Sequence, residues 1–362
     1  MQAKRSVPVR VWDWLDVRYH TSTLSQALLH VEIPQTARTY YLGGITMFFF
    51  MVQVITGMLL LVYYQPTPDA AYPSILFIMN GVNFGWLIRS VHSWGANLMI
   101  LFCVLHLVRV FFQGAYKRPR EITWGVGFML LLLTLAFGFT GYLLPWDQRA
   151  YWATTVGTEI AGAIPVIGQP VSVFLRGGTD ITARTLSRFF GVHVLVLPLS
   201  VILMLVVHLT MVHQQGLADP KRERVENDPI FETSGTTKKE RKLLPFFPNY
   251  MLDEFIAWYV MLAALIVLAS LFPAGLAAPA DPLRTPAHTK PEWYFLFLYQ
   301  ALKYVPRIIG VALPLIAGLV VFLLPFLDRN PYIAARRRPI VIVAGLVSIA
   351  GVIILTILGS VS

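Results

Sequence analysis

The sequence has little cysteine and little charge, and each shortage excludes a class of protein. Its one cysteine, Cys103, cannot form a disulfide within the chain, and neither a cysteine-based metal site nor a CxxCH motif for covalent haem is present. Only 13% of the 362 residues are charged, whereas 56% are hydrophobic. A soluble domain of this length needs far more charge to cover its surface. The composition therefore indicates a membrane protein.

Seven apolar runs of about 20 residues are long enough to cross a bilayer as helices. They cover residues 42–64, 86–112, 123–143, 189–212, 253–273, 308–327 and 339–359. Lys4 and Arg5 are not closely followed by an apolar core with a small-residue cleavage site, which argues against a cleaved signal peptide.

Basic residues gather in the loops of one side. The N-terminal arm, the loop 117–120, the stretch 214–250, Arg329 and the run 336–338 hold 19 of the 29 Lys and Arg residues. Such an excess is typical of cytoplasmic loops, so we expect a multi-pass protein with a cytoplasmic N-terminus. The net charge of +10 reflects this bias and favours contact with anionic membrane lipid. Nucleic-acid binding needs a soluble basic surface that the chain lacks.

The chain divides at a charged, proline-punctuated stretch near residues 215–250. We expect an interfacial arm over 1–35, with an amphipathic helix within 11–30, and a four-helix domain over 36–215. A cytoplasmic linker over 216–250 and a three-helix C-terminal domain over 251–362 complete the chain. Two long outer loops, at about 144–188 and 274–307, are each expected to contain short surface helices.

Four histidines lie inside two of the apolar runs, in pairs of similar spacing. His92 and His106 are 14 residues apart, and His193 and His208 are 15 apart. On a helix these separations return to within about 40° and 60° of the same face, four turns further along. Imidazole in hydrocarbon is costly unless it is paired or coordinated. Two facing helices of this kind would clamp two metal centres, one near each side of the membrane, and bis-histidine haem is the best candidate.

Two further runs carry glycine pairs with the same repeat. Gly43 and Gly57 are 14 residues apart, as are Gly127 and Gly141. Glycine lets a flat, bulky group approach a membrane helix closely, although it also serves ordinary helix packing. Together with the histidines, these glycines predict an all-α integral membrane protein: a four-helix di-haem bundle plus three further transmembrane helices, with amphipathic interfacial helices.

Five motifs make the chain resemble cytochrome b, the membrane core of the quinol-oxidising cytochrome bc and bf complexes. They are NFGWLIRSVHSW at 83–94, HLVRV at 106–110, GYLLPWDQRAYWA at 141–153, TLSRFFGVH at 185–193 and PEWYFLF at 291–297. The resemblance implies two non-covalent b-type haems, bifurcated quinol oxidation on the outer face, and electron transfer to a quinone-reducing site on the inner face, which adds to the proton gradient. It also implies a Rieske iron–sulfur protein, a c-type cytochrome or equivalent acceptor, and a homodimer of complexes.

Topology assigns the haem ligands. Both histidine-bearing runs pass from the outer to the inner side, so His92 and His193 form the outer pair and His106 and His208 the inner pair. The family arrangement is the same.

Three arginines lie close to the histidines at span ends. Arg89 and Arg109 are expected to pair with haem propionates, because a guanidinium binds a carboxylate through two hydrogen bonds. For Arg188 we leave a propionate and a lipid headgroup equally open.

The resemblance places the quinol-oxidising site at the loop that begins with Pro291. Oxidising quinol releases two protons, and Glu292 is the family's residue for accepting one. Tyr294 stands beside it as a further catalytic candidate. The other wall of the pocket is assigned to Tyr142, Pro145 and Trp146, and Tyr142 is a third catalytic candidate.

The inner quinone site is less sharply marked. His213 matches a quinone-contacting histidine of respiratory-type cytochromes b, and Asp253 and Glu254 fall where that type places a carboxylate partner. A histidine and a carboxylate could together protonate reduced quinone. The alternatives are an interfacial histidine and a pair of acids that favour a helix N-terminus.

Three departures from the respiratory pattern resemble the bf type: the 15-residue spacing, PWDQ at 145–148, and only three spans after the linker. In that type the three spans belong to a separate subunit, so this chain looks like a bacterial fused form of the inner membrane. The bf type also attaches a third haem through a cysteine where this chain has Tyr41, so a third, covalent haem is not expected.

Two other classes of protein also carry intramembrane histidine. One is a di-haem anchor of another quinone-linked oxidoreductase, which does not carry the PEWY motif. The other is a proton-coupled transporter, whose histidines form relays and need no matched spacing.

Overall fold

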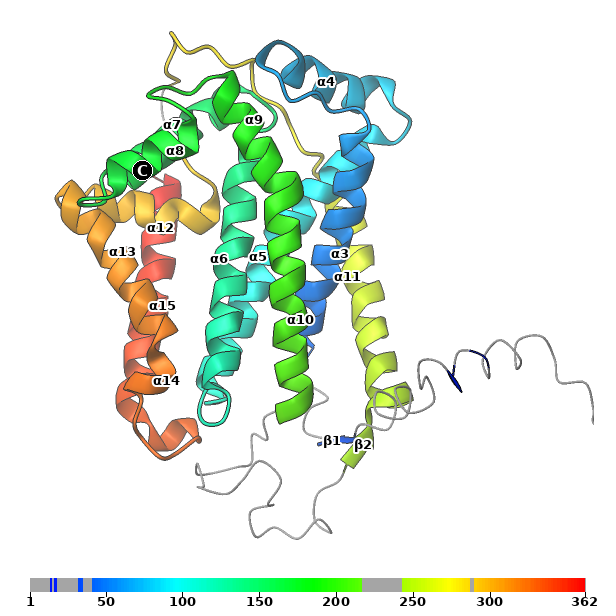
Figure 1. The fold of residues 1–362 in the computed structure, drawn as a ribbon, viewed down its shortest axis with the longest axis vertical. Coiled ribbons are helices and arrows are strands. Elements are labelled where there is room, and N and C mark those ends of the chain that lie inside the picture. The colour runs from blue at the N-terminus through cyan, green and yellow to red at the C-terminus, as the bar shows by residue number, and fades with distance from the viewer. Residues whose placement is uncertain are drawn as a thin grey trace, which may run out of the picture.

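Helices make up most of the described structure. It is a computed structural model, and it describes residues 14, 16–17, 32–34, 41–216, 243–286 and 290–361. Most of the predicted arm and interfacial helix, and the linker over 217–242, lie outside the described residues. Figure 1 shows long helices standing side by side, with shorter ones across the upper end.

Four long helices form the central bundle. They are α3 (Leu42–Leu61), α5 (Gly85–Phe112), α6 (Glu121–Tyr142) and a continuous segment of α9 (Ala183–Gly191), η2 (Val192–Val196) and α10 (Leu197–Gln215). Helix α3 packs on α5, α5 on α6, and α6 on α10. Much of the buried core lies on α3, around Phe49 and Phe50, and Met99 of α5 and Val201 of α10 join it.

The predicted spans agree with the structure except at one place. In the described part of the chain, six helical segments are long and apolar enough to cross a membrane, among them α11 (Met251–Leu271) with the preceding η3 (Phe246–Tyr250), and α15 (Pro339–Val361). The run predicted over 308–327 is instead α13 (Arg307–Phe322), which is shorter, followed by α14 (Leu324–Leu327). Pro325 explains the break, because proline has no amide hydrogen to continue the helix.

The expected surface helices lie at the upper end in Figure 1. Helix α7 (Gln148–Gly162) and α8 (Gly168–Arg176) lie in the first long loop, and α12 (Trp293–Leu302) in the second. Helix α4 (Pro68–Gly81) connects α3 to α5. We call this end of the bundle the outer end, after the predicted topology, and the opposite end the inner end.

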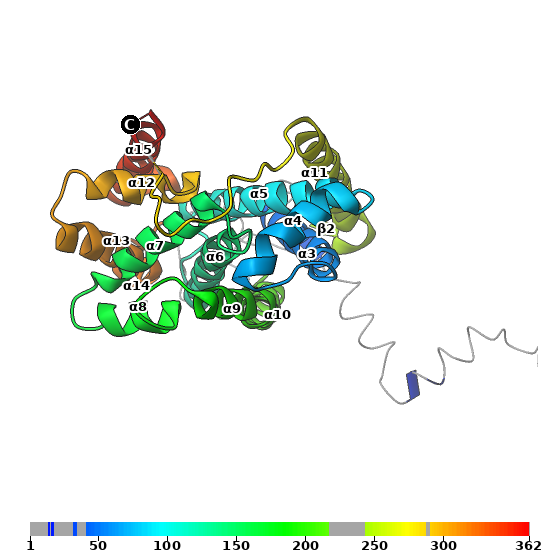
Figure 2. The same ribbon diagram turned by 90° about the horizontal axis from the view of Figure 1, so that it is seen from above.

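One of the three C-terminal spans, α11, lies apart from the other two, although we expected all three in one domain. Helix α11 packs on α3 and α5, whereas α13 contacts α6 and α15 packs on α12. Figures 1 and 2 both place α11 on the opposite side of the bundle from α13 and α15. Leu265 of α11 is fully buried in the central core, so apolar packing holds α11 apart from the other two.

A short two-stranded sheet joins the arm to the end of the predicted linker. Strand β1 (Glu32–Pro34) pairs antiparallel with β2 (Leu243–Pro245). Ile33, Leu244 and Tyr250 form a small buried cluster beside it. Within the predicted linker, the residues from Leu243 to Tyr250 therefore form regular structure that this apolar cluster holds in place.

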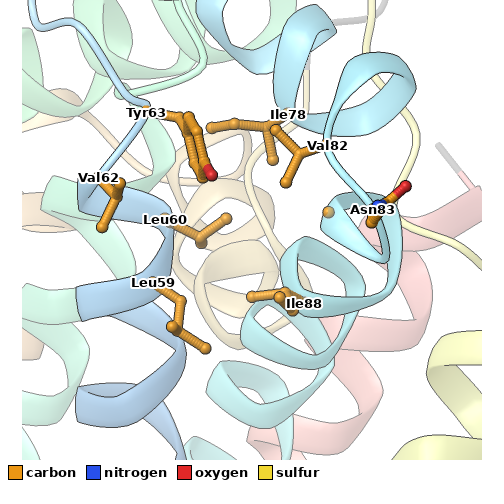
Figure 3. Close-up of a pocket in the computed structure, with 9 residues that line it drawn as sticks. Leu59, Leu60, Val62, Tyr63, Ile78, Val82, Asn83 and Ile88 are labelled. Atoms are coloured by element: carbon orange, nitrogen blue, oxygen red, sulfur yellow. The ribbon is translucent and has the colours of Figure 1, made fainter.

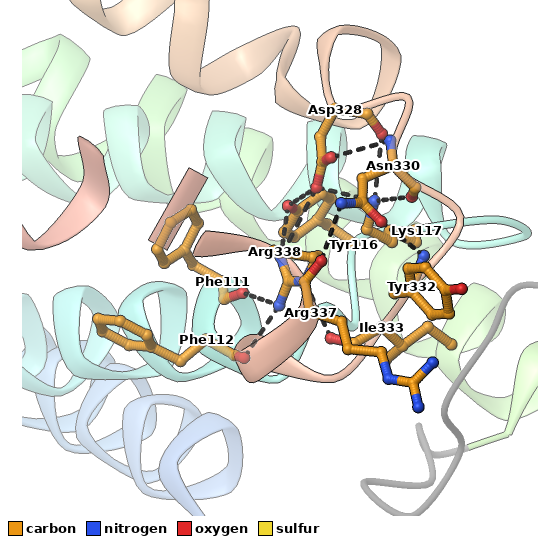
Figure 4. Close-up of polar contacts among 10 residues, drawn as sticks. All are labelled: Phe111, Phe112, Tyr116, Lys117, Asp328, Asn330, Tyr332, Ile333, Arg337 and Arg338. Atoms are coloured by element: carbon orange, nitrogen blue, oxygen red, sulfur yellow. Dashed lines mark hydrogen bonds and ion pairs between the residues drawn. The ribbon is translucent and has the colours of Figure 1, made fainter. Parts of the chain in front are cut away.

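A buried ionic cluster at the inner end links the α5–α6 loop to the start of α15 (Figure 4). Lys117 Nζ lies 2.7 Å from Asp328 Oδ2, and an Arg338 nitrogen lies 3.6 Å from the same oxygen. Tyr116 donates a hydrogen bond to Asp328 and accepts one from Arg338. Two of the basic residues that we assigned to the cytoplasmic surface are thus buried, because Asp328 neutralises them.

Candidate functional site

The outer histidines face each other across the bundle. His92 of α5 and His193 of η2 have ring centroids 6.5 Å apart, with an interplanar angle of 70°. Two imidazoles bound to one metal ion through bonds of about 2 Å have centroids about 6 Å apart. The two rings therefore have the separation that a shared metal ion requires.

A π-helical turn explains the unequal histidine spacing. Residues Val192–Val196 close the turn with a hydrogen bond from the Leu197 amide to the Val192 carbonyl, five residues back. Such a turn holds one residue more than an α-helical turn. The separation of His193 and His208 is therefore equivalent to 14 residues of regular helix, which is the spacing of His92 and His106.

Each of the four glycines faces one histidine. A Cβ atom built on Gly57 would lie 3.3 Å from His92, and one on Gly141 would lie 2.5 Å from His193. Towards the inner end, the corresponding distances are 3.2 Å from Gly43 to His106 and 3.2 Å from Gly127 to His208. The glycines thus divide the histidines into an outer layer and an inner layer, each with one glycine per ring.

Two threonines that the sequence interpretation missed hold the outer histidines. The Thr56 hydroxyl lies 2.8 Å from His92 Nδ1, and the Thr140 hydroxyl lies 3.1 Å from His193 Nδ1. Each threonine directly precedes one of the paired glycines, and this repeated Thr-Gly was the available signal. In the inner layer, His208 Nδ1 is buried without a hydrogen bond of standard geometry, although the Thr123 carbonyl is close enough to affect it.

Glu292 lies at the outer end, against the last turn of α6. It directly precedes α12, yet its side chain does not cap that helix. Instead, Tyr142 donates a hydrogen bond to its carboxylate. Burial raises the pKa of Glu292, and the positive charge of Arg149 and the Tyr142 hydrogen bond oppose this only in part. A half-buried carboxylate with a raised pKa can accept a proton and later release it.

Tyr294 completes the contact with α6. Its hydroxyl would be 2.7 Å from a Cβ atom at Gly138, so this glycine makes room for the ring. Burial raises the pKa of Tyr294, which keeps its hydroxyl protonated at neutral pH. On the other side of α12, Trp293 donates a hydrogen bond of 2.7 Å to Asn97 of α5.

The turn after α6 anchors the outer loop that leads to Glu292. Pro145 lies in this turn, and Trp146, which is buried with φ of 52°, accepts a hydrogen bond from the Ala280 amide. Asp147 caps α7 through the Ala150 amide and accepts a second hydrogen bond from the Ala277 amide. Pro145 and Trp146 therefore lie at the loop's anchor, and Tyr142 contacts Glu292 directly.

Comparison with known proteins supports the same interpretation. Residues 29–216 match the family described as cytochrome b/b6/petB, and residues 279–362 match cytochrome b (C-terminal)/b6/petD. The cytochrome bc complex cytochrome b subunit of Chlorobaculum thiosulfatiphilum is 40% identical over 95% of this chain and 79% of that protein. The chain belongs to the cytochrome b family.

Other relatives agree. Cytochrome b of Rickettsia bellii (strain RML369-C) is 35% identical over 96% of this chain and 85% of that protein. A solved structure titled hyperthermophilic respiratory Complex III has a TM-score of 0.85 and 32% identity, and the match covers 96% of this chain and 91% of that one. The cytochrome b/b6/petB family and the C-terminal/b6/petD family match successive segments of this one chain. The predicted fusion of the four-helix part and the three C-terminal spans is therefore confirmed. The rival transporter and anchor classes receive no support.

Membership of the cytochrome b family implies b-type haem, and the residues present fit such a group. The outer imidazoles lie at the separation that a metal ion needs. A glycine makes room beside every one of the four rings, and His208 Nδ1 is a buried polar atom without a hydrogen bond of standard geometry.

The expected propionate partners lie near the histidines in this cytochrome b fold. The charge of Arg89 acts on His92, and that of Arg109 acts on His106. Arg89 also donates to the Ala274 and Gly275 carbonyls of the outer loop. Arg188 instead donates to the Phe174 carbonyl of α8. Pairing of Arg89 and Arg109 with propionates stays a prediction.

The inner acids lie where α11 meets α3. Tyr41 donates a hydrogen bond of 3.2 Å to Asp253, and its ring lies 5.4 Å from that of Tyr250. The Glu254 carboxylate packs directly against Gly44, leaving no room for a Cβ atom there. His213 is exposed near the end of α10, which packs on α6, whereas α11 packs on α3 and α5. A shared role for His213 and the acids stays a prediction.

A separate apolar pocket of about 260 Å³ opens at the outer end between α3, α4 and α5 (Figure 3). Leu59, Leu60, Ile78, Val82 and Ile88 are among its lining residues. Neither the histidines nor Glu292 line it. The pocket suits a hydrocarbon chain and offers no carboxylate or imidazole to react.

Proposed function

We propose that the chain oxidises quinol at its outer end and reduces quinone at its inner end, as the membrane subunit of a bc-type complex. One observation carries the proposal: a single bundle holds two histidine layers, and each ring of each layer faces its own glycine. Such a bundle spans the membrane with a redox site near either side.

His92 and His193 would hold one haem, and His106 and His208 the other. When bound, a haem with two histidine ligands supplies one-electron transfer. The protein fixes the two ligand layers about 21 Å apart along the helices, since 14 residues separate them. Glycines keep side chains away from both layers, and Arg89 and Arg109 place positive charge beside them.

Quinol oxidation at the outer end releases two protons and two electrons. Glu292 accepts one proton, because its carboxylate lies in a half-buried position at the α6–α12 contact and gains little from staying charged. Tyr142 orients that carboxylate through its hydrogen bond. One electron leaves to a Rieske iron–sulfur partner and the other enters this chain, which divides the pair between two routes.

Quinone reduction at the inner end takes up protons from the cytoplasmic side. His213, Asp253 and Glu254 are the proton-handling groups that the chain offers there. Release of protons outside and uptake inside builds a gradient across a bacterial inner membrane. A c-type cytochrome or equivalent acceptor, membrane lipid and a second copy of the complex complete the assembly.

A redox titration of the purified chain, with haem extraction, tests the proposal. Two non-covalent b haems are expected, one lost in His92→Leu and the other in His106→Leu. A covalently retained haem would contradict the assignment at Tyr41. Absence of any haem from the wild-type chain would overturn the proposed function.

A further inference from the structure

Two buried hydroxyls distinguish the outer histidine layer from the inner one. We propose that Thr56 and Thr140 are positioning residues that orient and polarise both outer histidines, and so lower the reduction potential of the outer haem relative to the inner haem. The inference rests on the proposed function, because it concerns the same two haem sites.

The hydrogen-bond directions around Thr56 fix the tautomer of His92. Thr56 donates its hydroxyl hydrogen to the Val52 carbonyl at 2.6 Å, so towards His92 the hydroxyl can only accept. His92 must then carry its hydrogen on Nδ1, which leaves the Nε2 lone pair for a metal ion.

Thr140 repeats this arrangement from the opposite helix. It donates to the Ala136 carbonyl at 2.8 Å and accepts from His193 Nδ1 at 3.1 Å. Both threonines are buried, so water does not compete for these bonds. Each outer ligand is therefore held by a hydroxyl that is itself held by its own helix.

The inner layer has no equivalent in the described part of the chain. Leu42 and Val126 stand where Thr56 and Thr140 stand, directly before Gly43 and Gly127. No described hydroxyl bonds His106 or His208. The Thr123 carbonyl is close to His208, as the Phe137 carbonyl is to His193, so what the inner layer lacks is the hydroxyl. The two layers share their histidines and glycines but differ in this second set of contacts.

The difference has a direct electronic consequence. An acceptor on Nδ1–H makes the imidazole a more basic ligand, and a chain of two hydrogen bonds strengthens the effect. A more basic ligand stabilises the oxidised metal ion more than the reduced one, which lowers the potential. With both haems bound, transfer of an electron from the outer layer to the inner layer would then be favourable.

The test uses Thr56→Val and Thr140→Val in the intact complex, since valine replaces only the hydroxyl with a methyl group. Haem content, the midpoint potential of each haem, and the low-field EPR signal of each oxidised haem are measured. His92→Leu and His106→Leu identify which signal is outer. Thr46→Val is the matched control, because Thr46 lies in the same helix and donates to the Leu42 carbonyl at 2.9 Å.

We expect both threonine variants to raise the outer potential and to shift the outer EPR signal, with the inner haem unchanged. Serine at either position should restore the wild-type values, and Thr46→Val should change neither haem. Outer haem affinity should fall by roughly 10-fold or more, as is typical when a ligand's partner is removed. Unchanged outer signals, or equal shifts at both haems, would overturn the proposal.

A gain-of-contact variant keeps the test decisive if the valine variants do not accumulate. Val126→Thr places a hydroxyl beside His208 and should lower the inner potential alone. An unchanged inner potential in this variant would also refute the proposal. Failure of the proposed function is a different result, because the wild-type chain would then bind no haem.

Discussion

At the scale of single residues, the glycines carry the most specific information about the site. The closest approach is at Gly141, where a Cβ atom would overlap the His193 ring, whereas a Cβ atom at Gly57 would be a tight 3.3 Å from the His92 ring, which a small shift of that ring can relieve. Both lie in the outer layer. The same substitution should therefore have unequal effects at the two positions.

Gly141→Ala should displace His193 and lose the outer haem, at a cost of about 1–3 kcal/mol for the overpacked site. Gly57→Ala should retain most of that haem, because the contact is 3.3 Å rather than 2.5 Å. Gly191→Ala is the control, since nothing lies within 4 Å of its Cβ position. Haem extraction and absorption spectra measure how much outer haem each variant retains. Equal loss of haem in Gly57→Ala and Gly141→Ala would contradict the prediction.

A second prediction concerns Glu292 and the pH dependence of quinol oxidation. Its carboxylate accepts a proton only when ionised, and its pKa is raised above the ordinary 4.5, chiefly by burial. The quinol oxidation rate should therefore rise with pH, with a midpoint above 4.5.

Glu292→Gln should abolish this rise and lower the rate by between about 10² and 10⁴-fold, the usual contribution of a general base. Glu159→Gln is the matched control, because Glu159 is 55% exposed on α7 in the same outer region. Quinol–acceptor kinetics of the purified complex from pH 5 to 9 measure both. If the Glu292→Gln complex keeps the rising limb, another group is the base.

At the scale of elements, the π turn in the segment Ala183–Gln215 sets the register of the two histidine helices. It absorbs one residue between His193 and His208, so that both pairs have an effective spacing of 14. The extra residue is needed only for the π turn and not for the α-helix that follows.

Deletion of Leu195 should therefore convert the π turn to an α turn and keep both haems. Leu195 is 60% exposed, so its removal costs little packing. Deletion of Leu101 in α5, which is 37% exposed, should rotate His106 by about 100° relative to His92 and lose at least one haem. Absorption spectra of the two purified deletion variants measure their haem content. Equal loss of haem in both variants would show that the π turn does not set the register of the histidines.

At the scale of the whole molecule, the buried ionic cluster fastens the C-terminal part to the central four-helix bundle (Figure 4). The side chains of Lys117, Asp328 and Arg338 are at most 3% exposed. Lys117 also donates to the Asp328 and Asn330 carbonyls. The single carboxylate therefore neutralises two buried cations from segments more than 200 residues apart.

Asp328→Asn should destabilise the protein by about 3–5 kcal/mol, because it leaves both cations buried without a counter-charge. Asp69→Asn, at an exposed position of α4, is the control. Thermal unfolding in detergent measures the difference. A change as small as that of the control would mean that the cluster does not hold the two parts together.

The destabilisation caused by Asp328→Asn should also depend on pH. Burial alone would raise the pKa of Asp328, but the hydrogen bonds from Lys117 and Tyr116 outweigh it and hold the pKa below the ordinary 3.8. The stabilisation is therefore complete above pH 3.8 and lost as the pH falls through the lower folded value. The gap between wild type and Asp328→Asn should close in acid, and a constant gap would contradict the assignment.

The sequence by itself determined the class of fold, the two layers of paired histidines and the family. Apolar runs predict the spans, because a segment in hydrocarbon must satisfy its own backbone hydrogen bonds and a helix does so. The 14-residue spacing of histidines and glycines predicts that each pair lies on one helix face, because the helical period is fixed. Only the tertiary structure decided which side chains meet across the bundle. The Thr56 and Thr140 hydroxyls, the burial of Lys117 beside Asp328, and the separation of α11 from α13 and α15 depend on contacts between distant segments. No local periodicity encodes such contacts, since each is set by how neighbouring helices pack and which charges they neutralise.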